Sequence, residues 1–169
     1  MNHGLSADDW REVGFRLVLA ALAGAAIGLE RELRNKPAGL RTHILVSVGV
    51  ALFIMVPLVL SPDGAGPTSR VIQGIAAGIG FLGAGEILRI PSATEGSARV
   101  QGLTSAAAIW VAAAIGAAAG CGFWQIVLLG TVTTLVVLTL VWRVELLIAT
   151  RTKAAGKRLI VDAETPPRK

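Results

Sequence analysis

Long apolar runs alternate along this chain with short polar connections. Each run has close to the ~20 residues that an α-helix needs to cross the roughly 30 Å hydrocarbon core of a membrane. The pattern therefore predicts an all-α membrane protein, a bundle of five transmembrane helices. The predicted helices span residues 13–29, 42–60, 71–90, 102–120 and 122–142.

The composition agrees with this class. Hydrophobic residues make up 53% of the 169 residues and mean hydropathy is +0.66, which is more apolar than an ordinary soluble domain. The first run is not expected to be a cleaved signal peptide, because Asp8, Asp9 and Glu12 precede it where a signal peptide carries positive charge. With Cys121 as its one cysteine, the chain forms no intramolecular disulfide.

Basic residues predict the orientation of the bundle. The connection after the first run is rich in bases, whereas the second connection has only Arg70 and the fourth has no charge. Since cytoplasmic loops carry an excess of Lys and Arg, we predict the N-terminus outside and the C-terminus inside. The bases that this orientation places inside are Arg31, Arg34, Lys36, Arg41, Arg89, Arg99, Arg151, Lys153, Lys157, Arg158, Arg168 and Lys169.

This orientation divides the chain into three parts. Residues 1–12 form a short extracytoplasmic lead, residues 13–149 the five-helix membrane domain, and residues 150–169 a basic cytoplasmic tail that is expected to be disordered. The pI of about 10.4 does not indicate a nucleic-acid partner. The bases are interspersed with membrane segments and do not form one soluble basic face.

Small residues at helical spacing predict how the helices pack. Glycines let the backbones of membrane helices approach closely, and the third run has so many that we expect it at the centre of the bundle. Such residues also suit a homo-oligomer. The bulky fifth run is expected to face lipid, and Arg16 to extend its side chain to the headgroups. The glycines assigned to helix packing are Gly24, Gly28, Gly74, Gly78, Gly80, Gly83, Gly85 and Gly116.

Unusual polar residues gather, in this orientation, at the cytoplasmic ends of the first four helices. Acids at membrane helix ends are costly unless they are paired, so Glu30 and Glu86 are the leading candidates. Three interpretations stay open. The acids form structural ion pairs, Glu30 with Arg34 and with Arg41 across the turn, and Glu86 with Arg89. Alternatively Glu30, Glu86 and Thr104 hold a hard cation such as Mg²⁺, or the arginines and helix N-termini bind an anionic headgroup or phosphate.

The sequence contains no catalytic constellation. It has no nucleophile beside a base and no cluster of metal ligands, and its GIGFLGAG stretch lies within an apolar run and not after a strand. We therefore predict no enzyme, no catalytic residue, no bound metal and no cofactor. His43 is expected to be simply hydrogen-bonded and not a proton relay or metal ligand.

Four motifs, in this order, resemble the MgtC/SapB family of bacterial inner-membrane proteins. They are GAAIGLERE at 24–32, AGLRTHILVSVG at 38–49, GIGFLGAGEILR at 78–89 and VQGLTSAAAIWVAAAIGAAAGCG at 100–122. The resemblance implies a five-helix domain in the bacterial cytoplasmic membrane and a link to magnesium limitation. It also implies a short form, because members associated with virulence carry an ACT-like domain after the last helix.

The resemblance and the polar residues together select a functional cluster at the cytoplasmic face. Glu86 departs from the family pattern, since relatives usually have an apolar or small residue there. The best-known member is associated with restraint of the F-type ATP synthase, so the resemblance implies a membrane-protein partner. The predicted cluster comprises Glu30, Arg31, Gly39, Leu40, Arg41, Thr42, Glu86, Arg89 and Thr104.

Three functions are compatible with this sequence, and the simplest is a purely structural bundle whose charges only set the topology. The other two are more specific. The first is a non-enzymatic regulator that acts through membrane-protein interactions during magnesium limitation or other stress. The alternative is a small transporter or channel for magnesium, potassium or protons, in which Glu30 and Glu86 line the path of the ion.

Overall fold

The computed structural model describes residues 9–60, 65–91, 98–141 and 143. Most of the predicted lead and the whole predicted tail lie outside these residues. The chain forms two compact units, Met1–Thr134 and Leu135–Lys169, and the candidate site lies in the first. The described helices are α1 (Trp10–Leu33), α2 (Leu40–Leu60), α3 (Ala65–Glu86), α4 (Leu103–Gly120) and the helix Trp124–Val141.

Four of these helices are long and apolar enough to cross a membrane: α1, α2, α4 and the helix Trp124–Val141. The protein is therefore mostly helical and belongs to the membrane class, as predicted. α3 does not reach the same apolar character, because Arg70, Gln73 and Glu86 lie within its 22 residues.

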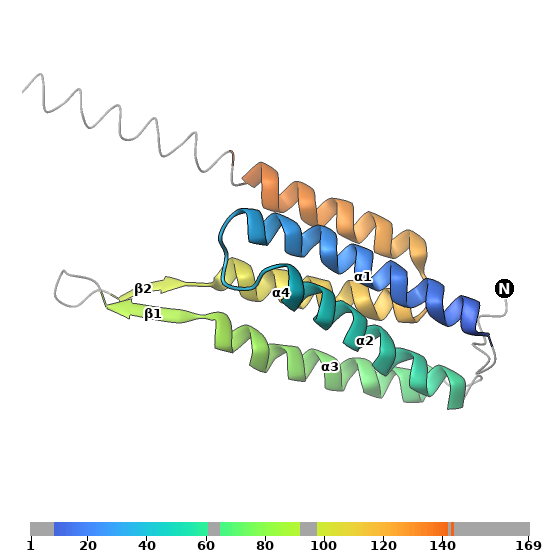
Figure 1. The fold of residues 1–169 in the computed structure, drawn as a ribbon. Coiled ribbons are helices and arrows are strands. Elements are labelled where there is room, and N and C mark those ends of the chain that lie inside the picture. Colours follow the sequence, from blue (N-terminus) through green and yellow to red (C-terminus); the bar gives the residue numbers. More distant parts are fainter. Residues whose placement is uncertain (1–8, 61–64, 92–97, 142, 144–169) are drawn as a thin grey trace, which may run out of the picture. The chain divides into compact units, whose positions relative to one another are not determined.

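The first unit is built around α1, α2 and α4 (Figure 1). Each of these helices packs against the other two. The backbones approach so closely that a Cβ on Gly24 would lie 2.6 Å from the carbonyl oxygen of His43, and one on Gly116 would overlap the backbone of Ser47. Small residues thus determine the spacing of the core, as in other membrane bundles. Buried alanines fill the same interfaces: Ala20, Ala23, Ala51, Ala112 and Ala119.

α3 lies at the edge of the unit and packs against α4 and, to a smaller extent, α2. A Cβ on Gly74, Gly78, Gly80 or Gly85 would meet no atom within 4 Å, and one on Gly83 would make ordinary contact with Ala106. The prediction that this helix occupies the centre of the bundle is wrong. The close backbone contacts are made by glycines of α1 and α4 instead.

The third connection forms a β-hairpin that the sequence did not reveal. β1 (Leu88–Pro91) pairs antiparallel with β2 (Ala98–Gln101), with Leu88 opposite Gln101. The helix predicted over 71–90 is therefore misplaced at both ends, since α3 starts at Ala65 and stops at Glu86. Pro67 is tolerated there because the first turn of a helix has no intrahelical partners for its N–H groups.

Arg16 takes a different position from the one expected. Its side chain is buried instead of reaching the headgroups, and its Nη1 donates to the carbonyl oxygen of Gly120 at 2.7 Å. Its Nε also donates to Glu12 Oε1 at 2.7 Å. The last carbonyls of a helix lack intrahelical donors and carry partial negative charge, so the guanidinium satisfies the C-terminus of α4.

Candidate functional site

The connection between α1 and α2 lies at the same end of the first unit as the β-hairpin (Figure 1). α1 ends in a Schellman motif, in which Lys36 N donates to Arg31 O at 3.0 Å and Asn35 N to Glu32 O at 2.9 Å. Asn35 has φ 52°, a left-handed conformation that asparagine tolerates better than most residues. This turn reverses the chain within a few residues and brings its charged side chains together.

Glu30 forms the centre of an ion-pair network on α1. Its Oε2 lies 2.5 Å from Nη2 of Arg31, and its Oε1 pairs with Nε of Arg34 one turn later. Arg31 and Glu30 are nearly buried, with 3% and 11% of their side chains exposed. Of the three interpretations of Glu30, its surroundings are therefore those of a structural ion pair.

Glu32 secures the start of α2, a contact that the sequence did not indicate. Its Oε2 accepts from Leu40 N at 3.1 Å, one of the helix N–H groups that lack an intrahelical acceptor. A Cβ on Gly39 would collide with the same carboxylate. Gly39 and Leu40 of the predicted cluster thus hold the α1–α2 turn closed against Glu32.

His43 and Ser47 place polar atoms inside the packed interface of α2. Both side chains are fully buried, and the ring Nδ1 of His43 lies 2.9 Å from the carbonyl oxygen of Gly39. Within the described residues, however, His43 Nε2 and Ser47 Oγ have no hydrogen-bond partner. Buried polar atoms without partners are uncommon, so this pair is an unsatisfied polar spot in the core. The sequence signal for this pair was the i, i+4 spacing of two polar residues, which places them on the same face of a helix.

Glu86 reaches the same region from the end of α3. Glu86 and Arg31 both lie close enough to His43 to interact with its ring electrostatically. Glu86 Oε2 is a further buried atom without a hydrogen-bond partner in the described chain. The backbone of Glu86 packs directly on Gly102, where φ is 94° and a Cβ would collide with the Glu86 carbonyl. Only glycine suits both the conformation and the space.

The remaining members of the predicted cluster are less closely joined. Arg41 and Thr104 are exposed, and Thr42 is half-buried. Arg89 belongs to β1 opposite Val100, and its side chain lies outside the described residues. The predicted helical pair of Glu86 with Arg89 is not formed as a helix contact, because α3 ends at Glu86.

The described residues offer no group of three or more His, Cys, Asp or Glu side chains that could hold a metal ion. Glu30, the acid at the centre of the ion-pair network, already faces two arginines. What this end of the bundle presents outward is Arg41, Thr104 and the exposed turn. The arrangement is suited to contact with a charged or polar partner more than to a chelate.

Comparison with known proteins identifies relatives over most of the chain. Residues 17–147 match the MgtC family. The protein SrpB of Synechococcus elongatus is 50% identical over 141 residues, 80% of this chain and 78% of its own length. The "Putative magnesium transporter YhiD" of Escherichia coli K12 is 46% identical over 129 residues, 73% of this chain and 57% of its own. The protein MgtC of Salmonella typhimurium LT2 is 44% identical over 119 residues, 70% of this chain and 48% of its own.

This chain thus spans about half the length of the Escherichia coli and Salmonella relatives. The family match at residues 17–147 covers most of the helical region described above. None of these three names describes an enzyme. No solved structure matches the chain.

Proposed function

Because the chain belongs to the MgtC family, we propose that it is a multi-pass protein of the bacterial cytoplasmic membrane that regulates another membrane protein without catalysing a reaction. Adaptation to magnesium limitation is the setting that the family resemblance implies, and one relative is named a "Putative magnesium transporter". The proposed partner is a membrane protein, and the F-type ATP synthase is the first candidate by family resemblance.

The observation that carries this proposal is the mismatch between the composition of α3 and its exposure. Gln73, Ala77 and Gly80 are exposed along one side of α3, and Gln73 lies near the middle of the helix. A side-chain amide in hydrocarbon needs a hydrogen-bonding partner, and small residues permit close approach of a second helix. The two features together are typical of a helix–helix interface, so a partner helix is the better occupant of this side.

Arg41 supplies the polar half of the proposed contact. It is exposed at the start of α2, at the end of the bundle that carries the α1–α2 turn. An arginine there can pair with a carboxylate or phosphate of a partner through two parallel hydrogen bonds. Two changes should therefore weaken function while leaving the core intact: Arg41→Ala and Gln73→Leu.

The test is growth of a deletion strain in low magnesium. We expect the wild-type gene and Lys36→Ala, which removes another exposed base of the same turn, to restore growth. Arg41→Ala and Gln73→Leu should fail to do so at equal amounts of membrane-inserted protein. Full rescue by both variants would sink the proposed contact, and a deletion strain without any growth defect would remove the link to magnesium.

A second candidate function is transport of a cation or proton. It is supported by the buried polar atoms without partners on His43, Ser47 and Glu86 and by the name of the Escherichia coli relative. If it holds, purified protein in liposomes should conduct magnesium, potassium or protons, and Ser47→Ala should alter the flux more than Ser105→Ala. Absence of flux for all three ions would dispose of it.

A further inference from the structure

His43 has an open proton-accepting position inside the protein. Its ring Nδ1 lies 2.9 Å from the carbonyl oxygen of Gly39, and because a carbonyl oxygen only accepts, Nδ1 carries the hydrogen. The neutral ring then has its lone pair on Nε2. His43 is fully buried, and Nε2 has no hydrogen-bond partner among the described residues. This nitrogen is therefore an acceptor that the described part of the protein leaves unused.

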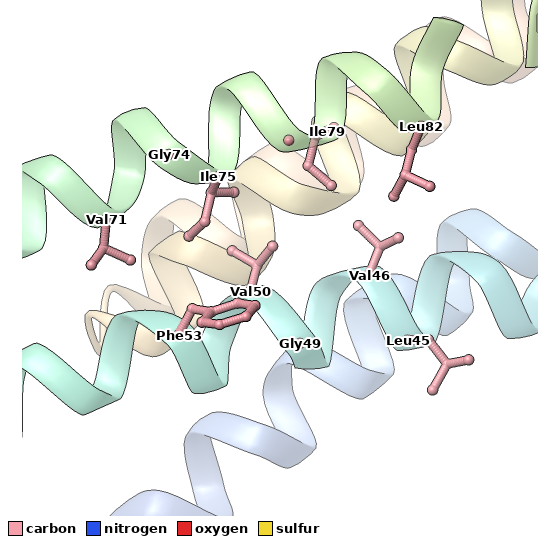
Figure 2. A pocket seen from close by; sticks show the side chains of 11 residues that line it. Leu45, Val46, Gly49, Val50, Phe53, Val71, Gly74, Ile75, Ile79 and Leu82 are labelled. Atoms are coloured by element: carbon pink, nitrogen blue, oxygen red, sulfur yellow. The ribbon is translucent and has the colours of Figure 1, made fainter. Parts of the chain in front are cut away.

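Glu86 brings a carboxylate to the same level of the bundle. Figure 2 shows Val46 of α2 and Leu82 of α3 pointing toward each other across the groove between these helices. His43 lies about one turn before Val46, and Glu86 lies one turn after Leu82. Both residues thus belong to the next layer toward the α1–α2 turn. Glu86 interacts electrostatically with the ring, and its Oε2 is a buried acceptor without a partner in the described part of the chain.

The other charges around this ring are few. α1 contributes Arg31, whose charge is offset by Glu30 at 2.5 Å. α4 has no charged residue along its length. On α2 itself Arg41 is exposed, and it lies two residues before His43 on a different face of the helix. Glu86 is therefore the acid that stabilises a positive charge on the ring.

We propose that His43 and Glu86 together bind one proton from the solvent at this end of the bundle, and that the bound proton joins α2 to α3. Without the proton, Nε2 and the carboxylate are both acceptors and form no hydrogen bond with each other. A hydronium ion supplies the proton, which forms an N–H bond at Nε2 and leaves water behind. The imidazolium and the carboxylate then make a charge-assisted pair.

The position of Glu86 suits this role. Its side chain is only half-buried, so it connects the buried ring with the solvent. α3 packs on α2 to a small extent, so one added ion pair changes how firmly α3 is attached. The site does not rest on the proposed partner contact, and binding of a proton needs no path for ions through the membrane.

The protonation of His43 is directly measurable in the full-length protein. The chain has two histidines, so His3→Asn leaves His43 as the one imidazole for nitrogen NMR in nanodiscs. We expect the Nδ1–H tautomer at alkaline pH and the imidazolium at acidic pH. Glu86→Gln should move the midpoint to lower pH by about one unit, because it removes a nearby opposite charge. Glu32→Gln, which changes an exposed acid of the α1–α2 turn, should leave the midpoint unchanged.

The link between the helices has a separate readout. Spin labels are attached to cysteines at Leu45 on α2 and Phe81 on α3, which are 70% and 82% exposed, in a Cys121→Ser background. The distance between the labels should be shorter below the midpoint of His43 than above it. Glu86→Gln should abolish this difference, and Glu32→Gln should retain it.

Three results would overturn the proposal. An Nε2–H tautomer at alkaline pH would show that Nε2 is not the open position. Equal midpoints in wild type and Glu86→Gln would show that the carboxylate does not stabilise the charged ring. A distance between the labels that is the same at acidic and alkaline pH would show that the proton does not join α2 to α3.

Discussion

Arg16 joins two helices through a single guanidinium group. It was expected to extend toward the headgroups, but it is buried against the C-terminus of α4 and against Gly122, whose φ is 81°. The sequence held a usable signal, since a glycine-flanked helix end attracts a cation. The signal lay 104 residues away along the chain, and local spacing does not reveal which helix end an arginine will meet.

Removal of this contact should destabilise the bundle. Arg16→Gln leaves the Gly120 carbonyl without its donor in a buried position, which typically costs about 1–3 kcal/mol. We expect a lower thermal unfolding midpoint in detergent. Arg11→Gln, which changes an exposed arginine one turn earlier, should leave the midpoint nearly unchanged. Equal midpoints for the two variants would show that the buried contact contributes nothing.

The Cys121 thiol lies in the same region, and its rate of alkylation depends on its burial there. Burial raises the pKa of the Cys121 thiol, and the nearby charge of Arg16 opposes part of this shift. Since the thiolate is the reactive form, the increase in alkylation rate should occur at higher pH than for an exposed thiol. The measurement is the rate of maleimide labelling from neutral to alkaline pH. It compares Cys121 of the wild type with an exposed thiol, introduced as Lys36→Cys in a Cys121→Ser background. Coincident pH profiles would be inconsistent with a buried thiol.

At the scale of the element, the sequence predicted helices well where their whole length is apolar. α2 and α4 begin and end within two residues of the predicted bounds. α1 extends past residue 29 to Leu33, because Glu30 and Arg34 continue the helix with a pair at i, i+4 spacing. The failures concentrate around α3 and the hairpin, where short strands of four residues give no clear periodicity.

Glycine count did not indicate position in the bundle. Packing depends on whether a glycine faces a neighbouring backbone, and that depends on the three-dimensional arrangement. Gly116 faces Ser47, whereas Gly80 faces open space. The contacts of Glu32 with Leu40 and of Glu86 with Gly102 could likewise not be predicted from the sequence, because each joins groups from different elements. Glu30 with Arg34 was predictable because it is local.

Because Gly116 faces a backbone and Gly80 faces open space, we predict opposite effects of alanine substitution on stability at these two positions. Gly116→Ala forces a methyl group into the backbone of α2, and overpacking of this kind costs about 1–3 kcal/mol. Gly80→Ala removes a poor helix former from an uncrowded site, so it should be neutral or stabilising by up to about 1 kcal/mol. The measurement is the thermal unfolding midpoint of each variant in detergent. A loss of stability for Gly80→Ala as large as for Gly116→Ala would disprove the edge position of α3.

At the scale of the whole molecule, we predict five membrane spans with the N-terminus outside. Four described helices meet the requirements of length and apolarity, and five spans require α3 to cross as well. The distribution of basic residues supports five spans with the N-terminus outside. A reporter fused after Lys169 should then be active in the cytoplasm and silent outside it. The reverse pattern would contradict the proposed topology.

We propose that this protein acts by contact with another membrane protein through the exposed side of α3. Site-specific photo-crosslinking in cells tests it most directly, with the probe at Ala77 on that side and, as control, at Leu22, which is 64% exposed on α1. We predict a discrete protein adduct at Ala77, lost in Gln73→Leu, and none at Leu22. An absence of protein adducts at Ala77, or identical adducts at both positions, would contradict the claim.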